Sequence, residues 1–135
     1  MKKILAIIEK GEDGGYATYA ADDSIPVVGD GLTEDEARAS FEECLHEQAR
    51  YMKERIGEWP DWYDEDMEVE YRYDMTAFFM AFPFINVTEF AKSVNINPSL
   101  MRKYKSGVAK AGPRQKDLIQ HKFDDILNRL SSVRF

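Results

Sequence analysis

The sequence predicts an α+β protein in which a β-β-β-α-β domain is followed by an all-α domain. Short apolar segments rich in β-branched residues, separated by glycine clusters, fill the first part of the chain. A long segment with apolar residues three and four apart follows, and capped helical segments occupy the remainder. We expect residues 1–73 to form the first domain and residues 74–135 the second.

Three short strands are expected at the start. Residues 3–10, KILAIIEK, are short, apolar and β-branched, which predicts a buried strand. The cluster GEDGG at 11–15 predicts a turn, so that residues 16–20, YATYA, complete a hairpin. A third strand is expected over residues 25–28, and GDG at 29–31 is expected to break the chain before a helix.

A long helix and a fourth strand should complete the first domain. Thr33 predicts the start of the helix because Glu36 follows at the capping-box spacing, and Gly57 predicts its end. Alternation over residues 67–73, MEVEYRY, predicts the last strand, and the helix should cover one face of a largely antiparallel sheet. The expected apolar face of the helix is Ala37, Phe41, Cys44 or Leu45, Gln48 or Ala49, and Met52.

Composition narrows the class of protein. The 135 residues include one cysteine, which excludes an internal disulfide and a multi-cysteine zinc site. No apolar run reaches the ~20 residues of a membrane span. The N-terminus begins like a signal peptide, but Glu9 and Lys10 interrupt the apolar run too early. We therefore expect a cytoplasmic protein that does not contact a membrane.

Charge is distributed unevenly along the chain. Residues 1–83 carry a formal net charge of −13 and residues 84–135 one of +6. No acid occurs between Glu89 and Asp117. This asymmetry indicates two domains with different partners, one of them a polyanion, although two halves that attract each other would also explain it.

The second domain shows several helix boundaries. Asp74 and Pro83 predict a helix over residues 75–82, and Thr88 predicts the start of a short one over residues 89–94. Asn97 followed by proline is typical of an N-cap, so a further helix is expected over residues 98–106. Asn95 tolerates the left-handed conformation of a tight turn, and Gly107 should end the helix.

Two short helices joined by a three-residue turn are typical of a helix-turn-helix motif of the Cro/repressor type. Ala91 is small where the helices would cross, and Met101 and Tyr104 should point inward. Arginine and lysine bind guanine edges, and serine and lysine bind phosphates, although a plain helical pair with a solvated basic face remains an alternative. The expected DNA-binding residues are Ser99, Arg102, Lys103, Lys105, Lys110 and Arg114.

The final helix, expected over residues 113–130, carries more apolar surface than so small a domain can bury, which favours a homodimer or a higher homo-oligomer. Its apolar residues are Leu118, Ile119, Phe123, Ile126, Leu127 and Leu130.

Signs of catalysis are weak. No phosphate-binding glycine loop or nucleophile elbow occurs, and Cys44 and His46 are two positions apart on a helix, so they face different directions. Asp22, Asp23 and Asp30 could hold Mg²⁺ as in a nuclease, but solvated turns are the commoner explanation. We expect no enzymatic activity, no cofactor and no metal.

Three segments of the chain resemble those of one known protein family. The opening ILAIIEKGEDGGYATYAAD and the segment GDGLTEDEARASFEECL resemble that family's first strands and first helix. VTEFAKSVNINPSLMRKYKSG is similar to the helix-turn-helix tail of the members that bind DNA. By these segments the whole chain resembles the HicB-like antitoxin family.

The resemblance implies a partial ribonuclease-H-like domain with no working active site, which occludes a small basic HicA-like toxin that cleaves mRNA. It also implies a tail that binds the operator and represses the operon. The alternative is a stand-alone transcription regulator whose N-terminal domain oligomerises or senses a ligand. The aromatic residues that would then line a ligand pocket are Trp59, Trp62, Tyr63, Tyr71 and Tyr73.

Overall fold

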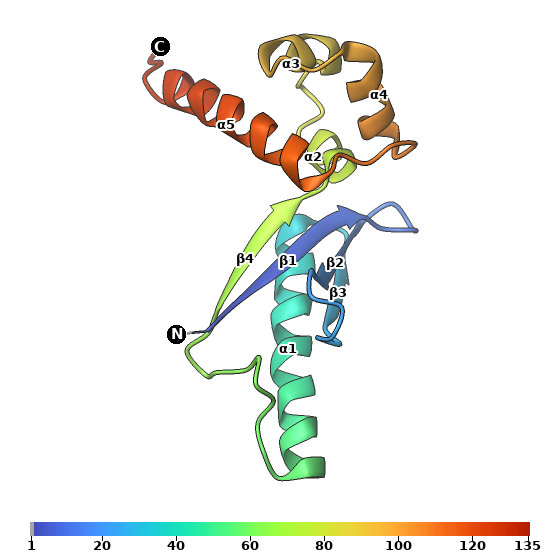
Figure 1. Ribbon diagram of the computed structural model, residues 1–135, viewed down its shortest axis with the longest axis vertical. Coiled ribbons are helices and arrows are strands. Elements are labelled where there is room, and N and C mark those ends of the chain that lie inside the picture. The colour runs from blue at the N-terminus through green and yellow to red at the C-terminus, as the bar shows by residue number, and fades with distance from the viewer. Residues whose placement is uncertain (1) are drawn as a thin grey trace. The chain divides into compact units, whose positions relative to one another are not determined.

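The computed structural model describes residues 2–135 and is shown in Figure 1. Within them, a four-stranded mixed sheet and five helices give an α+β architecture. The chain divides after Ala77 into two compact units, here called unit 1 and unit 2, of which unit 2 is Phe78–Phe135. No helix in this described part combines the length and apolar character needed to cross a membrane.

Unit 1 contains the sheet, with strand order β3-β2-β1-β4. The strands are β1 (Lys3–Lys10), β2 (Tyr16–Ala20), β3 (Val28–Gly31) and β4 (Glu68–Tyr73). β1 pairs antiparallel with β2, and β2 with β3, whereas β4 pairs parallel with β1. The prediction of a largely antiparallel sheet is therefore wrong for β4, because α1 carries the chain from the β3 edge to the opposite edge.

β3 lies further along the chain than predicted, and it contains the glycines that were expected to break it. A Cβ at Gly29 would lie 2.4 Å from the backbone N of Phe41, and one at Gly31 would lie 2.6 Å from that of Ala37. Both neighbours belong to α1 (Glu34–Ile56). The glycines therefore allow β3 to pass directly against the helix. In a sequence, glycines required for such a close approach cannot be told apart from glycines that mark a turn.

α1 begins as predicted. The Thr33 hydroxyl accepts a hydrogen bond from the Glu36 N–H at 3.2 Å, and the Glu36 carboxylate accepts one from the Leu32 N–H at 2.9 Å. Gly57, at φ +92°, ends the helix as predicted. One face of α1 packs on the sheet to form the core of unit 1. The fully buried residues of this face are Ala37, Phe41, Leu45 and Ala49.

Unit 2 is helical and has an aromatic core. It contains α3 (Val87–Ser93), α4 (Pro98–Ser106) and α5 (Pro113–Leu130), and α2 (Met75–Ala81) spans the division between the units. The predicted cap of α2 is confirmed, since Asp74 accepts a hydrogen bond from the Ala77 N–H at 2.8 Å. Rings with centroids 5.2–5.9 Å apart join α2, α3 and α5. These rings are Phe78, Phe79, Phe90 and Phe123.

Candidate nucleic-acid interface

α3 and α4 pack closely and are joined by residues 94–97. Asn95 adopts the left-handed conformation predicted for it, with φ +60°. The Ile96 N–H donates to the Ala91 carbonyl at 2.9 Å, which folds the turn back onto α3. Ala91 is fully buried, so its small side chain lets the two helices approach.

α3 starts earlier than predicted. Its N-cap is Asn86, whose side chain accepts a hydrogen bond from the Glu89 N–H at 2.9 Å, and not Thr88. Asparagine and threonine are both good N-caps, and two of them only two positions apart give the sequence no basis for a choice.

α4 has the bounds that the sequence predicts. The Asn97 side chain accepts a hydrogen bond from the Ser99 N–H at 2.8 Å, and Pro98 occupies the first helical position. Gly107, at φ +81°, closes the other end, and its N–H donates to the Tyr104 carbonyl at 3.2 Å. Caps at both ends therefore fix the length of this short helix.

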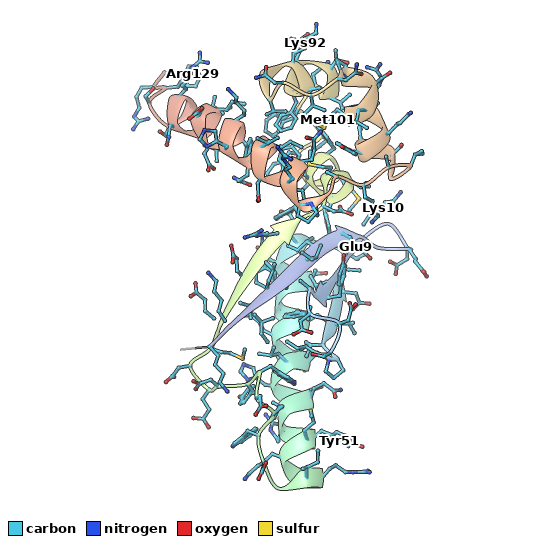
Figure 2. The ribbon with its side chains drawn as sticks, viewed as in Figure 1. Glu9, Lys10, Tyr51, Lys92, Met101 and Arg129 are labelled. Carbon is cyan, nitrogen blue, oxygen red and sulfur yellow. The ribbon has the colours of Figure 1, made fainter. Side chains whose placement is uncertain are left out.

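The two faces of α4 differ in chemistry. Met101 and Tyr104 are buried as predicted, and Figure 2 shows Met101 inside the helical unit while Lys92 of α3 projects outward. The opposite face is polar and solvent-exposed. Its exposed residues include Ser99, Arg102, Lys103 and Lys105.

Arg102 makes a contact that the sequence does not reveal. Its guanidinium donates to the Thr88 hydroxyl of α3 at 3.2 Å. Both residues belong to unit 2. The hydrogen bond uses one of the five guanidinium N–H donors and orients the guanidinium, while the Arg102 side chain stays exposed. No sequence signal links positions 14 residues apart, and for this reason Thr88 was not expected to position a DNA-binding residue.

The other two predicted residues follow α4. The Ala109 N–H donates to the Lys103 carbonyl at 3.2 Å, and Ala111 is buried, so the loop after α4 is held against the helix. Lys110 is exposed on this loop, and Arg114 is exposed in the first turn of α5. All six predicted residues are thus solvent-exposed within unit 2.

The exposed face of α4 is electropositive. In the part of the chain that the structure describes, no carboxylate forms an ion pair with Arg102, Lys103 or Lys105. Glu89 of α3 lies 3.7 Å from Lys92 on the same helix. Such a face can bind a polyanion through guanidinium and ammonium groups without first breaking an internal ion pair.

The acidic residues considered for Mg²⁺ binding, Asp22, Asp23 and Asp30, all lie in unit 1. Asp22 accepts hydrogen bonds from the backbone N–H and hydroxyl of Ser24, and these bonds lower the pKa of its carboxyl group. Residues 2–135 contain no group of three or more His, Cys, Asp or Glu side chains placed to hold a metal ion. His46 Nδ1 lies 2.8 Å from the Tyr63 hydroxyl, a contact between α1 and the following loop.

The five aromatic residues considered for a ligand pocket make contacts within unit 1. Trp59 stacks on Tyr63 with centroids 5.0 Å apart, and Trp62 contacts the same ring edge-on. Tyr71 contacts Phe41, and Tyr73 bonds to α1. Trp62, Tyr63 and Tyr71 all pack against the core of unit 1, so these three side chains take part in core packing.

Comparison with protein-family models, with curated proteins and with solved structures finds no match for this chain.

Proposed function

We propose that this protein is a HicB-like antitoxin that represses its own operon. In this proposal α3 and α4 form a helix-turn-helix that binds operator DNA, and unit 1 is a partial ribonuclease-H-like domain that occludes a small basic toxin. The observation that carries the proposal is the outer face of α4, which is capped at both ends, exposed and cationic. The β-β-β-α-β order of unit 1 supports the second half.

The chemistry of α4 suits DNA recognition. A recognition helix enters the major groove with its N-terminal residues toward base edges, where Arg102 would bind guanine and Ser99 a phosphate. Thr88 would hold the guanidinium in position before binding and so reduce the loss of side-chain entropy. Lys110 and Arg114 lie after α4 and would add phosphate contacts.

α5 supplies a surface for a homodimer. Of its residues only Ile119 is buried, while Leu118, Leu127 and Leu130 are exposed by 56%, 45% and 60%. An open hollow of about 490 Å³ lies beside the end of this helix, lined partly by Ile126 and Leu130. A second copy packed here would bury these side chains and present two recognition helices to a two-fold operator.

The acidity of unit 1 supports a basic partner. The formal net charge of −13 on residues 1–83 comes entirely from residues of unit 1. A toxin that cleaves RNA needs a cationic surface, and an acidic protein would be attracted to that surface and compete with RNA. Inhibition by occlusion needs no catalytic group in unit 1.

A gel-shift titration on the DNA upstream of this gene, against scrambled competitor, tests the repressor half. We expect specific retardation, and the double variant R102A/K103A should weaken it by about a hundredfold or more, since each base contact contributes ~1–3 kcal/mol. The control is K10A/R50A, which removes two charges from exposed sites in unit 1. Equal binding by R102A/K103A and wild type would show that α4 is not the recognition helix.

Co-expression with the small basic protein encoded beside this gene tests the antitoxin half. We expect wild type and R102A/K103A to restore growth equally, because toxin binding uses unit 1. If no adjacent toxin exists while operator binding is retained, the stand-alone regulator is the better explanation.

A further inference from the structure

The two edges of the sheet are unlike each other. β3 is four residues long, and its glycines are pressed against α1. β4 is six residues long and pairs on one side with β1. The Glu68 N–H donates to the Lys2 carbonyl and the Asp74 N–H to the Ile8 carbonyl, each at 2.9 Å. Because the N–H and C=O groups of successive residues point to opposite sides of a strand, those of Val69 and Tyr71 point away from β1.

The side chains of β4 also alternate between the two faces of the sheet. Tyr71 contacts the Phe41 ring of α1, and the Tyr73 hydroxyl donates to Glu34 of α1 at 2.6 Å. Glu70 and Arg72 therefore lie on the face opposite α1, with side chains 39% and 58% exposed. The Arg72 guanidinium and the Glu70 carboxylate lie 3.6 Å apart in an ion pair along the edge strand, and both remain accessible to the opposite charges of a second copy.

We propose that β4 pairs antiparallel with β4 of a second copy of this chain, about a two-fold axis at Tyr71, to form one continuous eight-stranded sheet. In this register the outward N–H and C=O of Tyr71 exchange hydrogen bonds with those of its counterpart. Glu70 lies directly opposite Arg72 of the second copy, and Arg72 opposite its Glu70. Both pairs fall at the closely spaced, non-hydrogen-bonded positions, where side chains interact most strongly.

Charge selects this register over its neighbours. An axis at Val69 would place Glu68 opposite Glu70, and an axis at Tyr73 would pair Tyr71 with Met75, where α2 begins. At the Tyr71 axis, Glu68 faces Asp74 of the second copy, a like-charge pair at each end that limits the affinity. Lys3, 3.3 Å from Glu70, extends the central network into β1.

This association does not depend on the proposed operator binding and uses a surface other than α5. Together, the β4 edge and α5 would convert a dimer into a tetramer. The test therefore uses the full chain carrying L127D/L130D, two exposed α5 positions, so that self-association through α5 is removed. Sedimentation velocity measures the dimer that remains.

Charge reversal in trans is the decisive comparison. Added to this background, R72E and E70R should each weaken the dimer at least about tenfold, because each places like charges opposite one another twice. An equimolar mixture of the two should regain the dimer, since the arginine introduced in one variant then faces the glutamate introduced in the other. An intramolecular defect cannot be repaired by mixing. E68K should strengthen the dimer by removing the end repulsion.

The control is K10E, the same kind of charge change at the end of the central strand β1. It should leave the dimer unchanged, and circular dichroism checks that every variant is folded. A monomeric background protein at high micromolar concentration, or variants R72E and E70R that dimerise like it, would overturn the proposal. Gel shifts with R72E and E70R in the otherwise wild-type chain, where α5 is unchanged, report operator binding separately, so failure of one result does not alter the other.

Discussion

The two long helices, α1 of unit 1 and α5 of unit 2, use their apolar faces very differently. α1 buries Ala37, Phe41, Leu45 and Ala49 within its own unit. α5, with 18 residues against 23, buries only Ile119 and leaves three leucines exposed. The apolar face of α1 is therefore covered within unit 1. In a single copy of the chain, much of the apolar face of α5 is left exposed by unit 2.

The N-termini of the two helices also differ, and that of α1 is the better stabilised. α1 has the Thr33 cap and three acids in its first turn, which favour the positive end of the helix dipole. α5 has Gly112 as N-cap, which gives no side-chain hydrogen bond, and its first turn holds Arg114 and Lys116 but no acid. Cations there destabilise a helix but favour a bound phosphate. The start of α5 is therefore intrinsically less stable than that of α1.

The largest expected contrast between the helices is in their cores. Phe41→Ala should lower the free energy of unfolding of unit 1 by about 3–5 kcal/mol, because the ring is fully buried. Leu127→Ala on α5 should cost less than about 1 kcal/mol in a single copy. Urea unfolding followed by circular dichroism reports the helices of both units, and tryptophan fluorescence reports unit 1 alone, since Trp59 and Trp62 are the two tryptophans of the chain. Similar losses in both variants would remove the distinction between the helices.

A second test concerns how tightly the sheet holds α1. Gly29→Ala should cost about 1–3 kcal/mol or more, since the new methyl group would meet backbone atoms of α1 that cannot move aside. Gly112→Ala before α5 is the matched control, because no heavy atom lies within 4 Å of the added carbon. Equal unfolding midpoints in urea would show that β3 and α1 are not in rigid contact.

Substitutions at the N-caps of α1 and α5 should change stability in opposite directions and by smaller amounts. Thr33→Ala removes the N-cap of α1 and should cost about 1 kcal/mol. Gly112→Ser should do the reverse and stabilise α5 by a few tenths of a kcal/mol, since Gly112 already has extended backbone angles. Thermal unfolding followed by circular dichroism measures both. A Gly112→Ser variant that melts no higher than wild type would contradict the assignment of a weak start to α5.

The smallest expected effect is a pH dependence confined to unit 1. Burial, and then the hydrogen bond to Glu34, raise the pKa of the Tyr73 hydroxyl from 10.0 to about 12. The neutral phenol is favoured in the folded state, so its contribution is complete below about pH 10 and is lost as the pH rises toward 12. Urea unfolding from about pH 9 to pH 11.5 should show stability falling less steeply in Tyr73→Phe than in wild type. An unchanged slope would contradict the role of Tyr73.

Local signals made most of the secondary structure predictable. Thr33 with Glu36, Asn97 before Pro98, and Gly107 each act within a few residues, and the structure confirms all three boundaries. Gly29 was wrongly predicted to lie outside a strand. Glycine is required there because α1 packs against it, and α1 is close to Gly29 in space and not in sequence.

The remaining misses were non-local in the same way. The parallel pairing of β4 depends on which edge of the sheet the chain reaches after α1, and periodicity does not encode that choice. The exposed face of α4 followed from helical spacing, whereas the bond between Arg102 and Thr88 depends on how α3 and α4 pack.

The pairing of β1 with β4 also has a consequence during synthesis of the chain. Lys3 pairs with Glu68, so the central strand leaves the ribosome 65 residues before its second neighbour. At translation rates of 5–20 residues per second, the backbone N–H and C=O groups on one edge of β1 stay unpaired for roughly 3 to 13 seconds until β4 is made. An open strand edge of this kind attracts other nascent chains and chaperones. Codon usage between residues 11 and 67 would set how long the newborn protein stays exposed to both.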